Sequence, residues 1–202
     1  ASRGLSVLDY DKNRKYRFMI PSNDGYLYNY NKVGELVNGW SFQALENSLS
    51  QQVKYASVSS KDYIYVCDKK GNMSIVGRNG KKRTKINNIP ISGDFYVDNT
   101  NGNIYSTDSL ANVWLTQLNG TSTKIKTSDL ENHMFYVFPF TSDEIMNLFI
   151  SDDKSVKCYN SENKVMTFKV VATSLPKAIH FNNGSYLAIS NGEYCHLFKS
   201  DG

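Results

Sequence analysis

The side chains that most often perform chemistry are few in this 202-residue sequence and lie far apart. The histidines are His133, His180 and His196. His196 follows Cys195, and adjacent residues of a strand point to opposite faces, so this pair cannot act as a nucleophile and its base. The sequence contains no nucleophile-elbow, zinc-protease or phosphate-loop motif. It therefore predicts no catalytic residues and favours a protein that is not an enzyme.

One short segment has a spacing that suits a metal ion. Asp9, Asp11 and Asn13 alternate as D-x-D-x-N, which can place three oxygen ligands around Ca²⁺ in a loop. The pattern then fails, because Arg14 stands where the tight turn needs glycine and Arg17 stands where a later acid would complete the shell. Asp and Asn at turns commonly accept hydrogen bonds from their own backbone. We therefore expect no cofactor and no metal, with these three residues as the calcium candidates.

A dense run of cations is the second candidate site, a polyanion-binding rim. It comprises Arg78, Lys81, Lys82, Arg83 and Lys85. One interpretation is that lysines on an outer strand discourage pairing with other chains. The other is a basic rim, extended by Lys124 and Lys126, that attracts phosphate or sulfated glycan. No aromatic platform for stacking bases is interleaved with the cations, so we expect no nucleic-acid partner.

Composition limits the class of protein. Hydrophobic residues make up 40% of the chain and charged residues 21%, with a formal net charge of +4, which is typical of a globular protein. No stretch of 18 apolar residues occurs, so no membrane-spanning helix is predicted. Cys67, Cys158 and Cys195 each lie in an apolar run without C-x-x-C spacing, and we expect three buried free thiols.

The elements that must position these residues repeat. Short alternating runs rich in Tyr, Phe, Ile and Val are separated by turns of Gly, Asn, Asp and Ser. The turn after the second run of each unit falls at Gly25, Gly71, Asn112, Lys154 and Gly192. The turn after the third run falls at Gly34, Gly80, Gly120, Asn163 and Gly202. Both series advance by about 42 residues a step, which indicates a repeat architecture.

Four antiparallel strands in such a period are typical of a β-propeller blade. We therefore predict an all-β fold, a single β-propeller domain over 1–202 with about five four-stranded blades. The blades are expected at approximately 5–43, 53–88, 92–128, 133–171 and 176–202. The last blade lacks a strand, which favours a fragment of a larger propeller that self-associates through uncovered blades. A sandwich or barrel would explain the density of strands but not the period.

Two loops are expected to contribute to a binding surface. The segment 44–52 is the best helical candidate and is interpreted as a long, partly helical connection, so that Gln43 to Gln52 protrudes between two blades. Thr141 to Glu144 could add to the same binding surface. The predicted first strands bring only Asp9, Asp94 and His180 towards a central channel, which is too little for an active site there.

Several segments resemble known propellers. DGYLYNYNKVGELVNGWSF, at 24–42, is similar to the repeat of pyrroloquinoline quinone-type propellers. LDYDKNRKYRFMIPSNDGYLYNYNKVGELVNGW, KDYIYVCDKKGNMSIVGRNGKKRTKI and YCHLFKSDG resemble cell-envelope β-propeller proteins of Bacteroidetes-type bacteria. This resemblance implies a secreted or periplasmic parent protein anchored through a lipid. It implies no functional residues that could be carried over.

The sequence thus predicts a non-catalytic propeller scaffold that binds a protein or another macromolecule in the bacterial envelope. Two alternatives stay open. One is a carbohydrate-active enzyme whose site lies in the channel or in another part of the parent protein. The other is a glycan-binding module, which would show solvent-exposed aromatic side chains gathered on one face.

Overall fold

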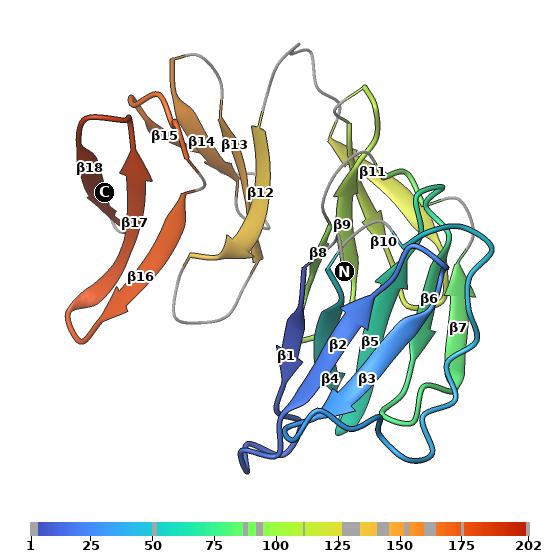
Figure 1. The fold of residues 1–202 in the computed structure, drawn as a ribbon. Coiled ribbons are helices and arrows are strands. Elements are labelled where there is room, and N and C mark those ends of the chain that lie inside the picture. The colour runs from blue at the N-terminus through green and yellow to red at the C-terminus, as the bar shows by residue number, and fades with distance from the viewer. Residues whose placement is uncertain are drawn as a thin grey trace. The chain divides into compact units, whose positions relative to one another are not determined.

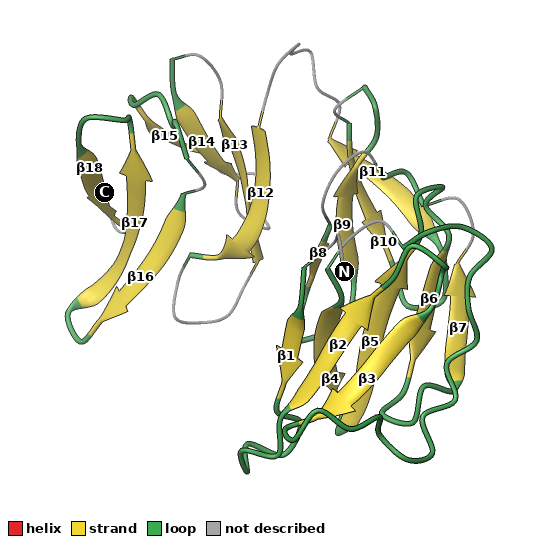
Figure 2. Ribbon diagram, viewed as in Figure 1, coloured by secondary structure: helices red, strands yellow, loops and turns green. Residues whose placement is uncertain are grey.

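The computed structural model describes residues 4–49, 52–86, 89–91, 95–110, 112–126, 134–140, 146–151, 154–159, 165–174 and 176–200. Within these ranges every regular element is a strand, as Figures 1 and 2 show. No helix that could cross a membrane occurs in the described part of the chain. The predicted all-β class is confirmed.

The strands form five antiparallel sheets, each built from strands that are consecutive in the chain. The first sheet contains β1 (Ser6–Leu8), β2 (Arg17–Pro21) and β3 (Leu27–Asn31). The second contains β4 (Lys54–Val58), β5 (Lys61–Cys67), β6 (Met73–Val76) and β7 (Lys82–Ile86). The third contains β8 (Tyr96–Val97), β9 (Ile104–Thr107), β10 (Val113–Thr116) and β11 (Ser122–Lys126). The fourth contains β12 (Met134–Pro139), β13 (Met146–Ser151), β14 (Val156–Tyr159) and β15 (Val165–Phe168), and the fifth β16 (Lys177–Phe181), β17 (Gly184–Ser190) and β18 (Cys195–Lys199).

Contacts within the chain divide it into two compact units, Ala1–Thr127 and Ser128–Gly202. The first unit holds the first three sheets, and the second unit holds the fourth and fifth. The expectation of a single domain over the whole chain stays a prediction.

The second sheet is buried on both faces. On one face Ile64 and Val76 share a core with Met19 and Leu27 of the first sheet. On the other face Tyr65 packs in a core with residues of the third sheet. A strand covered on both sides needs apolar residues at consecutive positions, and this explains the unbroken buried run at the end of β5.

The second unit has its own core between its two sheets. Phe149 and Val156 of the fourth sheet and Leu187 of the fifth are each fully buried in one cluster. Phe140 meets the ring of Phe149 edge-on, with 5.8 Å between the centroids. Each sheet therefore buries a face against the next sheet of its unit, as a stack of propeller blades requires.

The repeat seen in the sequence has a physical basis in its turns. Asp68 accepts hydrogen bonds from the backbone amides two and four residues later, and its carboxylate also binds the side chain of Asn72. Asp108 forms the same three interactions in the third sheet, with Asn112 in the corresponding place. The recurring Asp and Asn therefore close the turn after the second strand of a unit.

The first sheet departs from the predicted pattern. LVNGWSF, at 36–42, is expected as its fourth strand, but only a single bridge joins Leu36 to Tyr30. Beyond it, the N–H of Val37 binds the carbonyl of Asn29, and the indole Nε1–H of Trp40 donates to the carbonyl of Leu27 at 2.8 Å. A side chain thus provides the donor that a fourth strand would have supplied, so the first sheet ends at β3.

The long connection after the first sheet is also different from the prediction. Its described residues are not helical, and at Leu49, which is fully buried, the chain packs against the core instead of protruding. The N–H of Leu49 binds the carbonyl of Ser22, and the carbonyl of Ser48 accepts from the N–H of Lys69. The connection is therefore held between turns of the first two sheets by backbone hydrogen bonds that a helix would have used internally.

Candidate functional site

The segment Trp40 to Leu45 connects two hairpin turns of the first unit. At one end the backbone N–H and the hydroxyl of Ser41 bind the carbonyl of Asn79, at 2.9 and 3.1 Å. At the other end the N–H of Leu45 binds the carbonyl of Gly25 at 3.0 Å. Between them Phe42 is 4% exposed and anchors the segment in the core, which stabilises it by about 2–3 kcal/mol.

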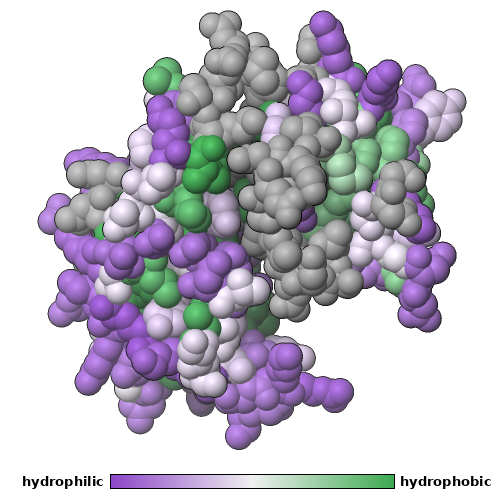
Figure 3. All heavy atoms as spheres, turned by 180° about the vertical axis from the view of Figure 1, so that it is seen from behind, coloured by the Kyte–Doolittle hydropathy of each residue, from purple (hydrophilic) through white to green (hydrophobic). Residues whose placement is uncertain are grey.

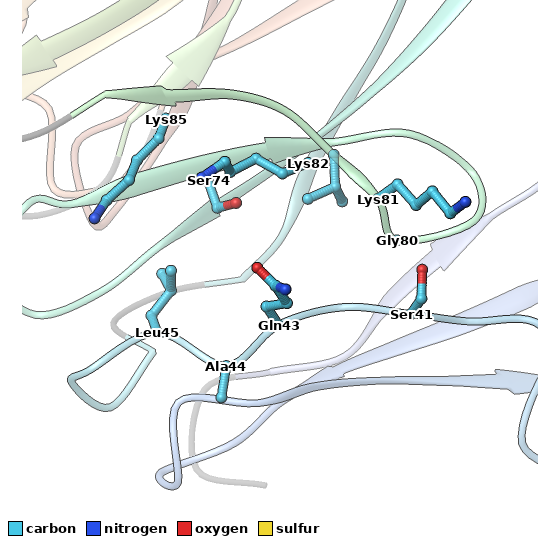
Figure 4. Close-up of a pocket in the computed structure, with 10 residues that line it drawn as sticks. Ser41, Gln43, Ala44, Leu45, Ser74, Gly80, Lys81, Lys82 and Lys85 are labelled. Atoms are coloured by element: carbon cyan, nitrogen blue, oxygen red, sulfur yellow. The ribbon is translucent and has the colours of Figure 1, made fainter.

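Side chains of this segment point to opposite sides. In Figure 4, Ser41, Gln43 and Leu45 point towards the β6–β7 hairpin, and Ala44 points away from it. Separate pockets lie on the two sides of the segment, and Ala44 lines both of them.

The first pocket, the aromatic pocket, has a volume of about 660 Å³. Its lining residues are Asp24, Tyr26, Tyr28, Leu36, Val37, Asn38, Gly39, Trp40 and Ala44. Leu27 and Asn29 point into the core, so the alternation along β3 turns Tyr26 and Tyr28 outwards. Their ring centroids are 4.9 Å apart and both side chains are half-buried.

The aromatic side chains around this pocket hold one another in place. Trp40 is fixed by its hydrogen bond to Leu27 and lies nearly parallel to Phe42, with ring centroids 6.2 Å apart. Phe42 meets Tyr26 edge-on at 5.8 Å. These rings are therefore fixed before any ligand arrives, which lowers the entropy that a ligand must overcome on binding.

Asp24 is the polar group best defined in the aromatic pocket. Its carboxylate accepts the N–H of Tyr26 at 2.9 Å and the hydroxyl of Tyr28 at 3.0 Å. The Tyr26 N–H is the main reason why the pKa of Asp24 lies below its usual value, and the hydroxyl of Tyr28 lowers it further. Asp24 is therefore charged at neutral pH and acts only as an acceptor, which suits a ligand rich in hydroxyl groups.

The second pocket, the lysine pocket, has a volume of about 520 Å³ and lies between the same segment and the β6–β7 hairpin. Its lining residues are Ser41, Gln43, Ala44, Leu45, Ser74, Val76, Gly80, Lys81, Lys82 and Lys85. A β-bulge assembles it. Val76 pairs with Lys82 but Ile75 pairs with Thr84, so β7 has one extra residue. Lys82 and Lys85, which simple alternation would separate, therefore lie on one face of the hairpin.

Four residues of the predicted basic rim, Arg78, Lys81, Lys82 and Arg83, line one pocket of about 430 Å³. Arg78 forms an ion pair with Asp62 and another with Asp11 at 2.6 Å, and it covers the ring of Tyr10. Arg83 donates to the carbonyl of Asp62 and lies over the ring of Tyr63. Lys81, Lys82 and Lys85 line the lysine pocket. In the third sheet Lys124 lies over the ring of Trp114, with 5.4 Å from Nζ to the centroid.

Asp62 links the first two sheets through a polar network. It is buried and receives hydrogen bonds from Tyr55 and Arg78. Burial raises the pKa of Tyr55 to about 12, and the hydrogen bond to Asp62 adds to this effect. Tyr10 is half-buried, and its buried hydroxyl has no hydrogen-bond partner in the described part of the chain. We assign this network a structural role.

Two of the three calcium candidates use their oxygens within their own loop. Asp9 accepts the backbone N–H groups of Asn13 and Arg14, and Asn13 accepts the N–H of Lys15. Asp11 faces the guanidinium of Arg78. The described residues contain no cluster of three or more His, Cys, Asp and Glu with the geometry of a metal site. The expectation of no metal, with these three residues as the calcium candidates, stays a prediction.

The remaining candidate side chains either form hydrogen bonds within their own sheet or lie outside the described residues. His180 shares a hydrogen bond with Ser185, and His196 with Asn191. His133, Asp94 and the Thr141–Glu144 loop fall outside the described residues.

The expectation of three buried thiols is correct for Cys67 and Cys158 but wrong for Cys195. Cys195 lies on β18, whose alternate residues are exposed, so its strand is covered on one face only. Burial raises the pKa of the Cys158 thiol to about 12.

Exposed apolar side chains elsewhere occur in small groups among hydrophilic ones on the face shown in Figure 3.

One pattern in the sequence indicates the aromatic face of this pocket. Tyr26, Tyr28 and Tyr30 alternate along a single strand, a pattern that places all three rings on one face. Trp40 joins them only because the chain leaves the sheet after Leu36. Neither that departure nor the bulge in β7 leaves a pattern in the sequence.

Comparison with known proteins supports the fold. No family model matches the chain, and no curated protein is significantly similar in sequence. Among solved structures, virginiamycin B lyase from Staphylococcus aureus, a β-propeller protein, matches with a TM-score of 0.64. The fold is that of a β-propeller. The match covers 99% of this chain and 67% of the lyase at 13% identity, so it concerns the fold and not the activity.

Proposed function

We propose that this β-propeller is a non-catalytic glycan-binding module whose binding site is the aromatic pocket. The observation that carries the proposal is the group of half-buried rings of Tyr26, Tyr28 and Trp40 around an open pocket that also contains Asp24. Prearranged aromatic faces with a few fixed polar groups are typical of small-ligand sites.

The chemistry of a sugar fits this arrangement. A pyranose ring has an apolar face of C–H groups, which packs on an aromatic face, and an edge of hydroxyl groups. Asp24 and Asn38 line the same pocket and provide acceptors and donors for hydroxyls. The negative charge of Asp24 disfavours a phosphate in this pocket.

Binding is favoured over catalysis by the composition of the pocket. Glycoside hydrolysis needs two carboxyl groups on opposite sides of the scissile bond. Asp24 is the single acid among the described residues that line the aromatic pocket. Its pKa is lowered, whereas a general acid needs a raised one.

The cellular setting belongs to the same proposal. Resemblance to cell-envelope propellers supports an extracytoplasmic location with a lipid anchor, where polysaccharides are abundant ligands. Fractionation of the producing cells would test this part, and recovery of the protein in the cytoplasm would contradict it.

The decisive experiment measures binding of two neutral hexasaccharides, cellohexaose and mannohexaose, and of their acidic counterparts, hexaglucuronate and hexamannuronate. Calorimetry and tryptophan fluorescence would be recorded for the wild type and for Trp40→Ala, Tyr28→Ala and Asp24→Asn. We expect at least one sugar to bind, and each substitution to weaken it about tenfold or more.

The matched control is Tyr194→Ala, which removes a ring that is 66% exposed in the turn between β17 and β18. It should leave the affinity unchanged. Tyr28→Ala keeps the experiment informative if Trp40→Ala fails to fold, because Tyr28 does not cap the edge of β3. If none of the four sugars binds, or if Tyr194→Ala weakens binding as much as Tyr28→Ala does, the proposal is wrong.

A further inference from the structure

We infer that the glycan is acidic, and that the lysine pocket binds a carboxylate or sulfate group of a sugar seated in the aromatic pocket. This inference rests on the proposed function and adds the chemical class of the ligand. Its first support is that the two pockets are neighbours. Ala44 lines both, and the Trp40–Leu45 segment is a single extended stretch of chain between them.

The dimensions suit a short oligosaccharide. Trp40 lines the aromatic pocket and its neighbour Ser41 lines the lysine pocket, and consecutive Cα atoms are only about 3.8 Å apart. The ring of Trp40 also reaches the hairpin of the lysine pocket, since a Cβ added at Gly80 would lie 3.0 Å from its Cδ2 and Cε3 atoms. One ligand can therefore pack against Trp40 and place a substituent on the lysine side.

The charges of the lysine pocket are available to a ligand. None of Lys81, Lys82 and Lys85 is ion-paired in the described part of the chain. Arg78 lies in the same hairpin, but its charge is neutralised by the carboxylates of Asp11 and Asp62. Arg78 is therefore neutralised by carboxylates, whereas the three lysines that line the lysine pocket have no ion pair in the described part of the chain.

Polar groups beside the lysines complete the anion site. Figure 4 shows Ser41 and Gln43 pointing from the Trp40–Leu45 segment towards the hairpin. Ser74 contributes a hydroxyl from β6, opposite Lys85 in the register of the sheet. Ammonium groups attract a carboxylate or sulfate as point charges, and neighbouring hydroxyl and amide donors can bind its remaining oxygens.

The arrangement of charge favours a sugar over a uniform polyanion. Asp24 carries a negative charge in the aromatic pocket and Lys81, Lys82 and Lys85 carry positive charges in the lysine pocket, so the combined surface holds charges of both signs. A nucleic acid, with a phosphate on every residue, would place one phosphate near Asp24. An acidic sugar can instead present hydroxyls to Asp24 and its acid group to the lysines.

The test compares each neutral hexasaccharide with its acidic counterpart, cellohexaose with hexaglucuronate and mannohexaose with hexamannuronate. It uses wild type, the double variant Lys82→Gln/Lys85→Gln and the control Lys69→Gln/Lys70→Gln. The control removes two exposed charges from the β5–β6 turn, so both variants have the same net charge. Hexathymidylate serves as a nucleic-acid probe.

We expect at least one acidic sugar to bind the wild type about tenfold more tightly than its neutral counterpart at low salt, with the difference decreasing as salt is added. Lys82→Gln/Lys85→Gln should abolish this preference and leave the neutral affinity unchanged, whereas the control should retain it. Equal affinity for the acidic and neutral sugars would overturn the inference and leave the proposed function intact. Absence of binding by all four sugars would overturn both, and tighter binding of hexathymidylate would assign the lysine pocket to nucleic acid instead.

Discussion

Replacement of Gly80 by alanine should detach the Trp40–Leu45 segment from the β6–β7 hairpin. Gly80 has a φ of +77°, and its added Cβ would lie 2.8 Å from the backbone nitrogen of Phe42. Because that atom belongs to the backbone, no rotation of a side chain can relieve the contact. Gly34 offers a matched control, with a φ of +83° and no atom within 4 Å of an added Cβ.

The two glycines occupy equivalent turns. Each donates to the carbonyl three residues earlier, Gly34 to Asn31 at 3.1 Å and Gly80 to Gly77 at 2.9 Å. Both substitutions therefore carry the same left-handed backbone cost of roughly 1–2 kcal/mol. Gly80→Ala adds an overpacking cost of about 1–3 kcal/mol. This added cost reports how closely the Trp40–Leu45 segment packs against the turn.

The assay is urea unfolding followed by tryptophan fluorescence, with the slope m required to stay constant between variants. We expect Gly80→Ala to lose about 1–3 kcal/mol more than Gly34→Ala and to lose sugar affinity, which Gly34→Ala should retain. Equal losses of stability for the two variants would refute the reasoning, because the segment would then not rest against the turn.

Three further predictions follow from individual side chains. The raised pKa of Tyr55 means that its stabilising effect is complete below pH 10 and is lost as the pH rises towards about 12, so Tyr55→Phe should flatten the alkaline part of a stability–pH curve. Burial opposes the charge of Asp68, but its four hydrogen bonds outweigh this effect and lower its pKa. Asp68→Asn should therefore lower the free energy of unfolding in urea by about 2 kcal/mol. The wild type should lose stability below pH 4 as Asp68 becomes protonated, and the variant should not show this loss. Cys195 is exposed and the other two thiols are buried, so a thiol reagent should modify one cysteine in the native protein and three after denaturation; three in the native protein would contradict the burial.

The sequence was sufficient to predict the fold because its signals are local. Asp68 and Asp108 close equivalent turns with bonds that span four residues, and their spacing therefore appears directly as a period. Consecutive apolar residues in β5 likewise indicate burial on both faces, as in a stack of sheets.

The site could not be predicted in the same way because long-range contacts form it. Trp40 lies in the segment expected as a fourth strand, and its actual position depends on a hydrogen bond to Leu27 and contact with Gly80. Whether Arg78 or Lys82 faces a ligand depends on acids 16 to 67 residues away and on a bulge. Alternation and composition carry no information on either.

The hydrogen bond between Trp40 and Leu27 has a consequence for how this position can evolve. Phenylalanine or tyrosine at position 40 would keep an aromatic face for a sugar but would leave the Leu27 carbonyl without its indole donor. That carbonyl belongs to the last strand of a sheet, so its exposure creates an edge on which another chain can add a strand. Selection for solubility would therefore retain tryptophan at this position even in a descendant that had lost its ligand, and persistence of Trp40 would not by itself be evidence of binding.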